Sequence, residues 1–485
     1  MGKLKTEVLN GVFYTAIAKY SGIIVSLIIT AILARLLKPE DFGVVVIASI
    51  FINFFSILTT VGLGPAIVQN RELDKTDLIS INTFAFLLAF LLTFLFIILT
   101  PLLVSFWDND ELLKRLFYLL SINIFFSIAS IVPNAIIMKE KKFKFIAIRT
   151  LVVQVVTGII SIIAVLFGFG IYSLILSPIL SSIILLIINF TYRPVYLSLK
   201  IQKKSIQKIF SFSLYQMLFN FIYLLYRNID KILIGKYFGM SSLGYYEKSY
   251  RLMMLPLENV SGVISPVLHP VLSEYQNNKD YLWHTYIQLL KLFSEIGLLL
   301  TVVIYFSSRC LIILFFGHQW ESAVPIFQIL SLSIGFQLMQ APIGAIFQSL
   351  NKTKALFFCS FFVLLFVCIA IFWGVYQNTL EYLTSALVLA FLIGFLTYQY
   401  FIVKCFGKKM LDIFKVICEP LICSLVLFVF LKYFFTLVCF QNIFFQLLLV
   451  GCLTIAFIFI LFTFGRFTVL KQLFLSIINK LRIFK

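Results

Sequence analysis

The chain has 485 residues, of which 61% are hydrophobic and only 12% are charged, and its mean hydropathy is +1.05. Soluble domains carry about a quarter charged residues, so these values exclude a soluble globular protein and predict an all-α polytopic membrane protein. The apolar runs are continuous and of helix length, whereas the strands of a transmembrane barrel alternate apolar and polar residues. Basic loops of a membrane protein account for the net charge of +19, and we expect no nucleic-acid partner.

Fourteen stretches are long and apolar enough to cross a bilayer, which takes about 20 residues. The seventh and eighth are the least apolar, as expected for helices that line a cavity. The predicted spans are 11–33, 42–64, 79–101, 116–137, 145–168, 172–192, 211–234, 243–266, 284–307, 323–348, 356–376, 381–403, 414–435 and 443–464.

Lys and Arg are unevenly distributed between the predicted loops. If the N-terminus is cytoplasmic, the loops on that side carry 24 of them and the opposite loops carry six. Because positive residues gather in cytoplasmic loops, both termini are predicted to be cytoplasmic. Six further basic residues lie deep inside spans: Lys19, Arg227, Lys231, Lys248, Arg251 and Lys432. Four of these six lie between 227 and 251.

The two halves of the chain resemble each other weakly. Arg35 and Gly43 match Lys236 and Gly244 at an offset of 201. Matches near an offset of 210 join Leu120 to Leu330, Ser121 to Ser331, Pro133 to Pro342, Lys142 to Lys352 and Lys144 to Lys354. Six spans per half place both halves the same way up, which predicts two pseudo-symmetric six-helix lobes related by an axis along the membrane normal. The predicted divisions are 1–210, 211–410 and a C-terminal part, 411–485, with two more spans and a basic tail.

The polar stretch 227–251 is the main candidate for a functional site. Ionisable groups at membrane depth are costly unless they face a partner or water, so we expect this stretch to line a central cavity that suits an anion. Its charged residues are Arg227, Asp230, Lys231, Lys236, Glu247, Lys248 and Arg251. On the seventh span one helical stripe holds Gln216, Asn220, Tyr223, Arg227 and Lys231.

Two structural alternatives stay open for these charges. The less favoured alternative for the stripe is a helix–helix seam in which Asp230 pairs with Arg227 or Lys231. Glu247 can simply pair with Arg251, four residues later. Glu258 lies near the same face as these two.

Three residues outside the stretch are also candidates. Lys19 shares a small and polar face of the first span with Thr15, Gly22 and Ser26, and either lines the cavity or reaches the membrane surface. Arg35, which matches Lys236 in the repeat, is included in the predicted substrate-binding set. Glu295, an isolated acid in the ninth span, and Asp230 are candidates for ion coupling.

The sequence offers no catalytic constellation. Three scattered His and eight Cys without CxxC spacing predict no metal site, and the absence of a Walker motif predicts no ATP hydrolysis. We therefore expect neither an enzyme nor a cofactor. The driving force is then an ion gradient, the membrane potential or removal of the product.

Four segments carry a resemblance to a known family. They read ILARLLKPEDFGVVVIAS after the first span, VGLGPAIVQ at the end of the second, NIDKILIGKYFGMSSLGYYEKSYRLMMLP across the seventh and eighth, and PVLHPVLSEYQ beyond. With the length and the span count, they resemble the Wzx-type polysaccharide flippases of the multidrug/oligosaccharidyl-lipid/polysaccharide exporter superfamily. The motifs are specific for the family and not for a substrate.

The resemblance implies a flippase that moves polyprenyl-diphosphate-linked oligosaccharide, a repeat unit of O-antigen, capsule or exopolysaccharide, from the cytoplasmic to the outer leaflet of a bacterial inner membrane. The implied partners are this lipid-linked sugar, the bilayer, and the polymerase and glycosyltransferases of the same pathway. Lys and Arg suit its diphosphate, which they meet with charge-assisted hydrogen bonds.

Other functions compete with this one. A multidrug or small-molecule cation antiporter of the same superfamily would call for buried carboxylates, and a lipid II flippase shares the fourteen spans and a cationic cavity. A membrane-bound glycosyltransferase or polymerase would need a large outer loop, whereas the longest here are about 15 residues (102–115 and 308–322). Nothing in the sequence favours a channel or a scaffold.

Overall fold

The computed structural model describes residues 2–70, 72–198, 202, 227–437 and 443–472, without the side chains of 2–13, 56–62, 263–267, 269–271 and 353. Within these residues the chain is helical and contains no strand. The chain divides into two compact units, unit 1, Met1–Gly244, and unit 2, Tyr245–Lys485. This division falls inside a helix, whereas the boundaries 1–210, 211–410 and 411–485 follow the sequence repeat and stay a prediction.

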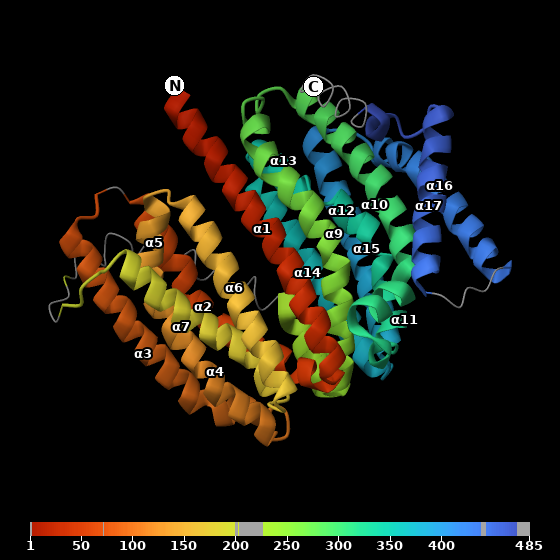
Figure 1. Ribbon diagram of the computed structural model, residues 1–485. Coiled ribbons are helices and arrows are strands. Elements are labelled where there is room, and N and C mark those ends of the chain that lie inside the picture. Colours follow the sequence, from red (N-terminus) through yellow and green to blue (C-terminus); the bar gives the residue numbers. More distant parts are fainter. Residues whose placement is uncertain (1, 71, 199–201, 203–226, 438–442, 473–485) are drawn as a thin grey trace, which may run out of the picture. The chain divides into compact units, whose positions relative to one another are not determined.

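Each predicted span overlaps one or more helices wherever the chain is described, and Figure 1 shows the helices. Unit 1 contains α1 (Gly2–Leu36), α2 (Pro39–Gln69), α3 (Lys75–Ser105), α4 (Glu111–Ala129), α5 (Ile131–Lys139), α6 (Phe143–Leu166) and α7 (Tyr172–Tyr192). α9 (Gly239–Ser273) begins in unit 1 and continues into unit 2. Unit 2 continues with α10 (Lys279–Phe316), η1 (His318–Trp320), α11 (Ala323–Ser331), α12 (Ile334–Met339), α13 (Ile343–Ser349), α14 (Thr353–Tyr376), α15 (Leu380–Phe406), α16 (Met410–Leu437) and α17 (Ile443–Thr463).

Ten helical segments of the described chain are long and apolar enough to cross a membrane, and an eleventh is a bent pair. The bent pair, Ala323–Ser331 with Ile334–Ser349, turns by 41°, so the tenth predicted span is broken rather than continuous. α9 is not among the ten, and its first half carries Glu247, Lys248 and Arg251. The seventh predicted span lies outside the described residues up to position 226. The all-α polytopic class is confirmed, and the described helices are compatible with fourteen spans.

The internal repeat is visible in the helix boundaries. α6 and α14 each have 24 residues, and they start at Phe143 and Thr353, 210 positions apart. Each is preceded by a residue with left-handed backbone at the same offset, Lys141 with φ 57° and Asn351 with φ 54°. Non-glycine residues adopt this conformation rarely. Its recurrence at one offset indicates that the two halves fold alike locally.

The core of unit 1 is built from aromatic side chains on neighbouring helices. Phe96 of α3 and Phe117 of α4 are fully buried, and their rings lie 5.4 Å apart. Phe55 of α2 approaches Phe96 edge-on at 5.0 Å. Edge-to-face contacts of this kind add to the dispersion attraction of a tight core. They fix α2, α3 and α4 against one another.

The start of α3 is set by a reciprocal cap. The carboxylate of Asp74 accepts the backbone N–H of Asp77 at 2.7 Å and the hydroxyl of Thr76 at 2.8 Å. The carboxylate of Asp77 in turn accepts the backbone N–H of Asp74 at 3.2 Å. These bonds satisfy donors that a helix start leaves open. The pKa of the Asp74 carboxyl lies below its ordinary value near 3.8, mainly because its carboxylate accepts the backbone N–H of Asp77.

We predict that Asp74→Ala speeds hydrogen exchange at the Asp77 amide at neutral pH, while Asp74→Asn, which keeps an acceptor, changes it less. Because the folded-state pKa is lowered, the cap stabilises the helix start above pH 4 and is lost as the pH falls through the lowered value. Parent and Asp74→Ala should therefore converge in strong acid. Equal protection of the two proteins at neutral pH would rule out this cap.

Candidate functional site

The charged stretch 227–251 is two helical segments separated by a turn. Residues 227–237 are helical, and Gly239, with φ +85°, marks the break before α9. Glycine adopts this left-handed conformation without the steric cost that a Cβ would bring. The stripe residues Gln216, Asn220 and Tyr223 lie outside the described residues.

Two glycines form a reciprocal contact at the beginning of α2 and α9. A Cβ added to Gly43 would overlap the carbonyl oxygen of Met240, and one added to Gly244 would overlap that of Pro39. All four residues belong to unit 1. Pro39 corresponds to Met240 and Gly43 to Gly244 at the offset of 201 found in the sequence. Gly43 thus faces Met240 while Gly244 faces Pro39, and such a reciprocal pair of contacts is what two-fold symmetry between repeated segments produces.

The charges of the first segment differ in exposure. Asp230 is buried, with 8% of its surface exposed, while Arg227 is exposed and Lys231 is half-buried. Residues four apart share a helix face, so Arg227 and Lys231 lie on a common side with Asp230 beside them. Arg227 is therefore the most exposed of the three charges, and the acid Asp230 is the most buried.

Lys236 lies against the loop between α3 and α4. Its Nζ is 3.0 Å from both carboxylate oxygens of Asp108 and 5.6 Å from the ring centroid of Phe106. Asp108 is 128 residues away in the chain, so no local pattern pointed to this ion pair. A substrate that uses Lys236 would have to compete with Asp108.

The charges of α9 occupy different faces. Lys248 is buried, with 5% exposure, and its Nζ lies 5.9 Å from the ring centroid of Phe316. Arg251 and Glu258 are exposed, and Glu247 is half-buried. Arg251 is 12 residues beyond Gly239, or ~18 Å along the helix, which is about half the thickness of a bilayer.

Lys19 and Arg35 are both exposed on α1. Lys19 lies in the candidate span Tyr14–Leu36 and Arg35 in its last turn. An exposed charge inside a span is stable only where it faces water or a polar partner. Both a cavity-lining position and one that reaches the membrane surface fit this exposure, so the role of Lys19 stays a prediction.

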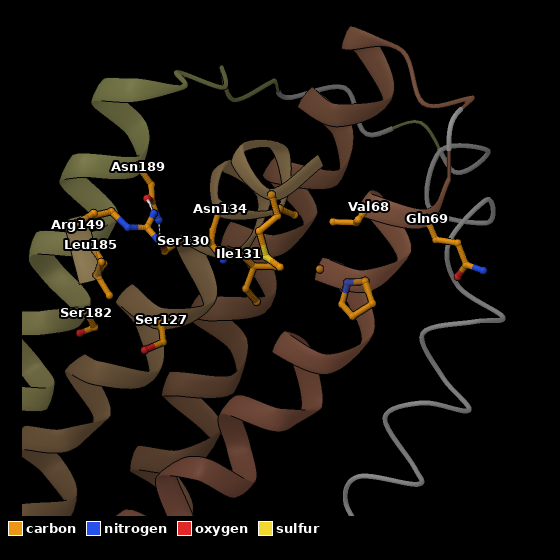
Figure 2. A pocket seen from close by; sticks show the side chains of 14 residues that line it. Val68, Gln69, Ser127, Ser130, Ile131, Asn134, Arg149, Ser182, Leu185 and Asn189 are labelled. Atoms are coloured by element: carbon orange, nitrogen blue, oxygen red, sulfur yellow. Dashed lines mark hydrogen bonds between the residues drawn. The ribbon is translucent and has the colours of Figure 1, made fainter. Parts of the chain in front are cut away.

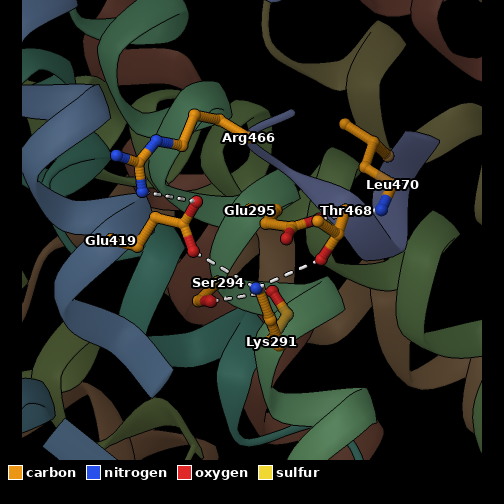
Figure 3. A network of polar contacts seen from close by, with 7 residues as sticks. All are labelled: Lys291, Ser294, Glu295, Glu419, Arg466, Thr468 and Leu470. Atoms are coloured by element: carbon orange, nitrogen blue, oxygen red, sulfur yellow. Dashed lines mark hydrogen bonds and ion pairs between the residues drawn. The ribbon is translucent and has the colours of Figure 1, made fainter. Parts of the chain in front are cut away.

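Glu295 belongs to a polar network at α10 in unit 2 (Figure 3). It is fully buried, and its Oε2 accepts the backbone N–H of Leu470 at 2.8 Å. Nearby, the Nζ of Lys291 lies 3.2 Å from Glu419 of α16 and 3.2 Å from the hydroxyl of Thr468. The network ties α10 to α16 and to the segment after α17.

We predict that Glu295→Leu lowers the free energy of unfolding by about 1–3 kcal/mol, because the partly buried N–H of Leu470 loses its acceptor. Glu295→Gln, which keeps an acceptor oxygen, should cost clearly less. Thermal unfolding of the two purified variants beside the parent measures the difference. Equal unfolding temperatures for the two variants would mean that the bond to Leu470 contributes nothing.

Sequence patterns did not point to two further basic residues as candidates, Arg149 and Lys291. Both lie near the predicted cytoplasmic ends of their spans, 145–168 and 284–307, yet Arg149 is 8% exposed and Lys291 is paired with Glu419. Their partners lie on other helices, and only the packing brings them together. For buried basic residues such as Arg149 and Lys291, the sequence gives one signal, an isolated charged residue within an apolar run.

A family model described as "Polysaccharide biosynthesis protein" matches residues 32–325 of this chain. The chain belongs to this family. Among its relatives, the teichuronic acid biosynthesis protein TuaB of Bacillus subtilis (strain 168) is 21% identical over 81% of this chain and 83% of that protein. The lipopolysaccharide biosynthesis protein WzxC of Escherichia coli (strain K12) is 22% identical over 71% of this chain and 70% of that protein. The resemblance to Wzx-type flippases is thereby confirmed.

Solved structures agree with this fold. The lipid II flippase MurJ in an inward closed conformation matches with a TM-score of 0.70 and 18% identity, over 93% of this chain and 99% of that one. An inward-facing multidrug resistance transporter of the MATE family in the MOP superfamily matches with a TM-score of 0.60 and 16% identity, over 79% and 95%. The family member described here therefore has the multi-pass fold of these transporters.

Proposed function

We propose that this protein is a flippase that carries polyprenyl-diphosphate-linked oligosaccharide from the cytoplasmic to the outer leaflet of a bacterial inner membrane. Family membership carries the proposal, because the relatives are named for polysaccharide biosynthesis, and one relative, ExoT of Rhizobium meliloti (strain 1021), is named as a succinoglycan biosynthesis transport protein. The chain would act by alternating access, without catalysis, with its termini in the cytoplasm and in concert with the polymerase and glycosyltransferases of its pathway.

The outward-facing cations support an anionic cargo. Arg227, Arg251 and Lys19 are exposed on helices at or near predicted spans, and such charges are stable at depth only beside water or an anion. A diphosphate offers a compact double negative charge to them, and Arg binds phosphate oxygens in a bidentate way. The proposed substrate-binding residues also include Arg35, Asp230, Lys231, Lys236, Glu247 and Lys248. Asp230 and Glu295 stay the candidates for ion coupling.

Removing the gene from its host tests the function in the cell. We expect the lipid-linked oligosaccharide to accumulate in the cytoplasmic leaflet, where a glycan-binding probe added to intact spheroplasts cannot reach it. Resupply of the parent protein should restore exposure to the probe. If the lipid-linked sugar stays exposed without the protein and organic cationic dyes accumulate instead, the antiporter function replaces this one.

A further inference from the structure

Unit 1 contains a partly open cavity of about 640 Å³ between α2, α4, α5, α6 and α7. Figure 2 shows the guanidinium of Arg149 and the amide of Asn189 on one side of it, with Val68 and Gln69 on the opposite side. The last turns of α2, α5 and α7 and the first turns of α6 meet here. By the predicted topology this is the cytoplasmic end of the unit. The volume lies in the range of small-molecule sites.

Arg149 is buried in the wall of this cavity and bonded there only to neutral groups. Its guanidinium donates to the side-chain oxygens of Asn189 and, at 3.0 Å, of Asn134. Asn189 is held in turn, because its amide donates to the hydroxyl oxygen of Ser130 at 2.7 Å. The Nε of Arg149 is buried and has no hydrogen-bond partner among the described residues. An arginine with five donors is thus fixed in place with part of its capacity unused.

The cavity lining carries donors and no counter-charge. Among the described lining residues none is acidic, and no ion pair to Arg149 occurs in the part of the chain that the structure describes. A buried cation without a partner is costly. The hydroxyl of Ser130 and the amide nitrogen of Asn134 add donors at the same side. A donor set of this kind around a positive charge fits an anion.

The rest of the lining is apolar, including Val68, Ile131, Met138 and Leu185. Arg149 is six residues beyond Phe143, the first residue of α6, or ~9 Å along the helix. A phosphate near the membrane surface would then contact Arg149, and an apolar group attached to it would contact the apolar part of the lining.

The geometry points to a phosphate-binding site inside unit 1, in which Arg149, held by Asn134 and Asn189, takes the phosphate group of a lipid headgroup or of a free phosphate. It is separate from the stretch 227–251, and it does not depend on the transported cargo. The bound phosphate would supply the negative charge that Arg149 lacks.

The test uses the full-length protein in a neutral detergent and counts bound ligand by native mass spectrometry. The probes are dioctanoylphosphatidylglycerol, dioctanoylglycerol without phosphate, and inorganic phosphate. We expect saturable binding of one phosphatidylglycerol, at least roughly tenfold tighter than dioctanoylglycerol, since charge-assisted bonds are the strong ones. If inorganic phosphate also competes at low concentration, the site takes the phosphate group from either source.

Two variants probe the site differently. Arg149→Gln removes the charge, and Gly64→Leu fills the cavity while leaving Arg149 in place. A Cβ on Gly64 would meet only Ile131, at 3.9 Å, so this variant is expected to fold. Both should weaken phosphatidylglycerol binding at least roughly tenfold. Arg309→Gln, which changes an exposed arginine paired with Glu321, should not.

Parent-like binding in both Arg149→Gln and Gly64→Leu would overturn the proposal. So would equal affinity of the parent for dioctanoylglycerol and phosphatidylglycerol, or the absence of saturable binding by either phosphate probe. Loss of binding in Gly64→Leu at an unchanged unfolding temperature supports the cavity as the site, even if Arg149→Gln does not fold.

Discussion

Alanine at position 251 is expected to slow transport of a polyprenyl-diphosphate-linked oligosaccharide by about ten- to a hundredfold. Arg251 is exposed and lies 12 residues beyond the start of α9, at a depth where a charge must face water or an anion. A hydrogen bond to a charged group contributes about 1.5–3 kcal/mol, and each 1.4 kcal/mol is a factor of about ten. The initial rate in vesicles of equal protein content measures the effect, and Arg227→Ala and Lys231→Ala should act in the same direction.

Arg251→Lys separates charge from geometry. It keeps the positive charge and loses the bidentate fork of arginine, so we expect a rate between those of the parent and Arg251→Ala. Arg309→Ala is the matched control, since Arg309 is exposed and paired with Glu321 outside the stretch. Parent-like rates in all three alanine variants of the stretch would mean that these cations serve structure alone.

A methyl group on Gly43 or Gly244 is expected to destabilise the protein by about 1–3 kcal/mol or more, the range for overpacked sites. Each new Cβ would overlap a backbone carbonyl oxygen, of Met240 or of Pro39. A backbone atom cannot relieve the overlap by a change of rotamer, as a side chain can. The unfolding temperature of Gly43→Ala and Gly244→Ala beside the parent measures the cost. Because both act on one crossing, the double variant should cost less than the sum of the two.

Gly64→Ala is the control for this pair, since it lies on α2 as well and has room for a Cβ. Alanine favours a helix over glycine by about 1 kcal/mol, so Gly64→Ala should leave stability unchanged or raise it. Unfolding temperatures of Gly43→Ala and Gly244→Ala at or above that of Gly64→Ala would contradict the close crossing of α2 and α9.

The sequence predicted the helices well because a span is a local property. A run of about 20 apolar residues crosses a bilayer whatever its neighbours are, and α6 and α7 begin within two residues of the predicted positions. The offset of 201 likewise pointed to the pair Gly43 and Gly244 before any contact was known. What the sequence missed is the 41° break inside the tenth span, between α11 and α12.

The partners of charged side chains could not be predicted in this way. Lys236 and Asp108 are 128 residues apart, and so are Lys291 and Glu419. Arg149 meets Asn189 across 40 residues. Such pairs depend on how helices pack and not on spacing within one helix. A hydropathy pattern can therefore flag a buried charge but cannot name its partner.

The most direct measurement follows a fluorescent polyprenyl-diphosphate oligosaccharide across vesicles that contain the parent protein. We expect the labelled lipid to reach the opposite leaflet faster than in protein-free vesicles, and an excess of unlabelled lipid-linked sugar to slow it. If the labelled lipid moves no faster than without protein, while the same vesicles transport organic cations, the flippase account is contradicted.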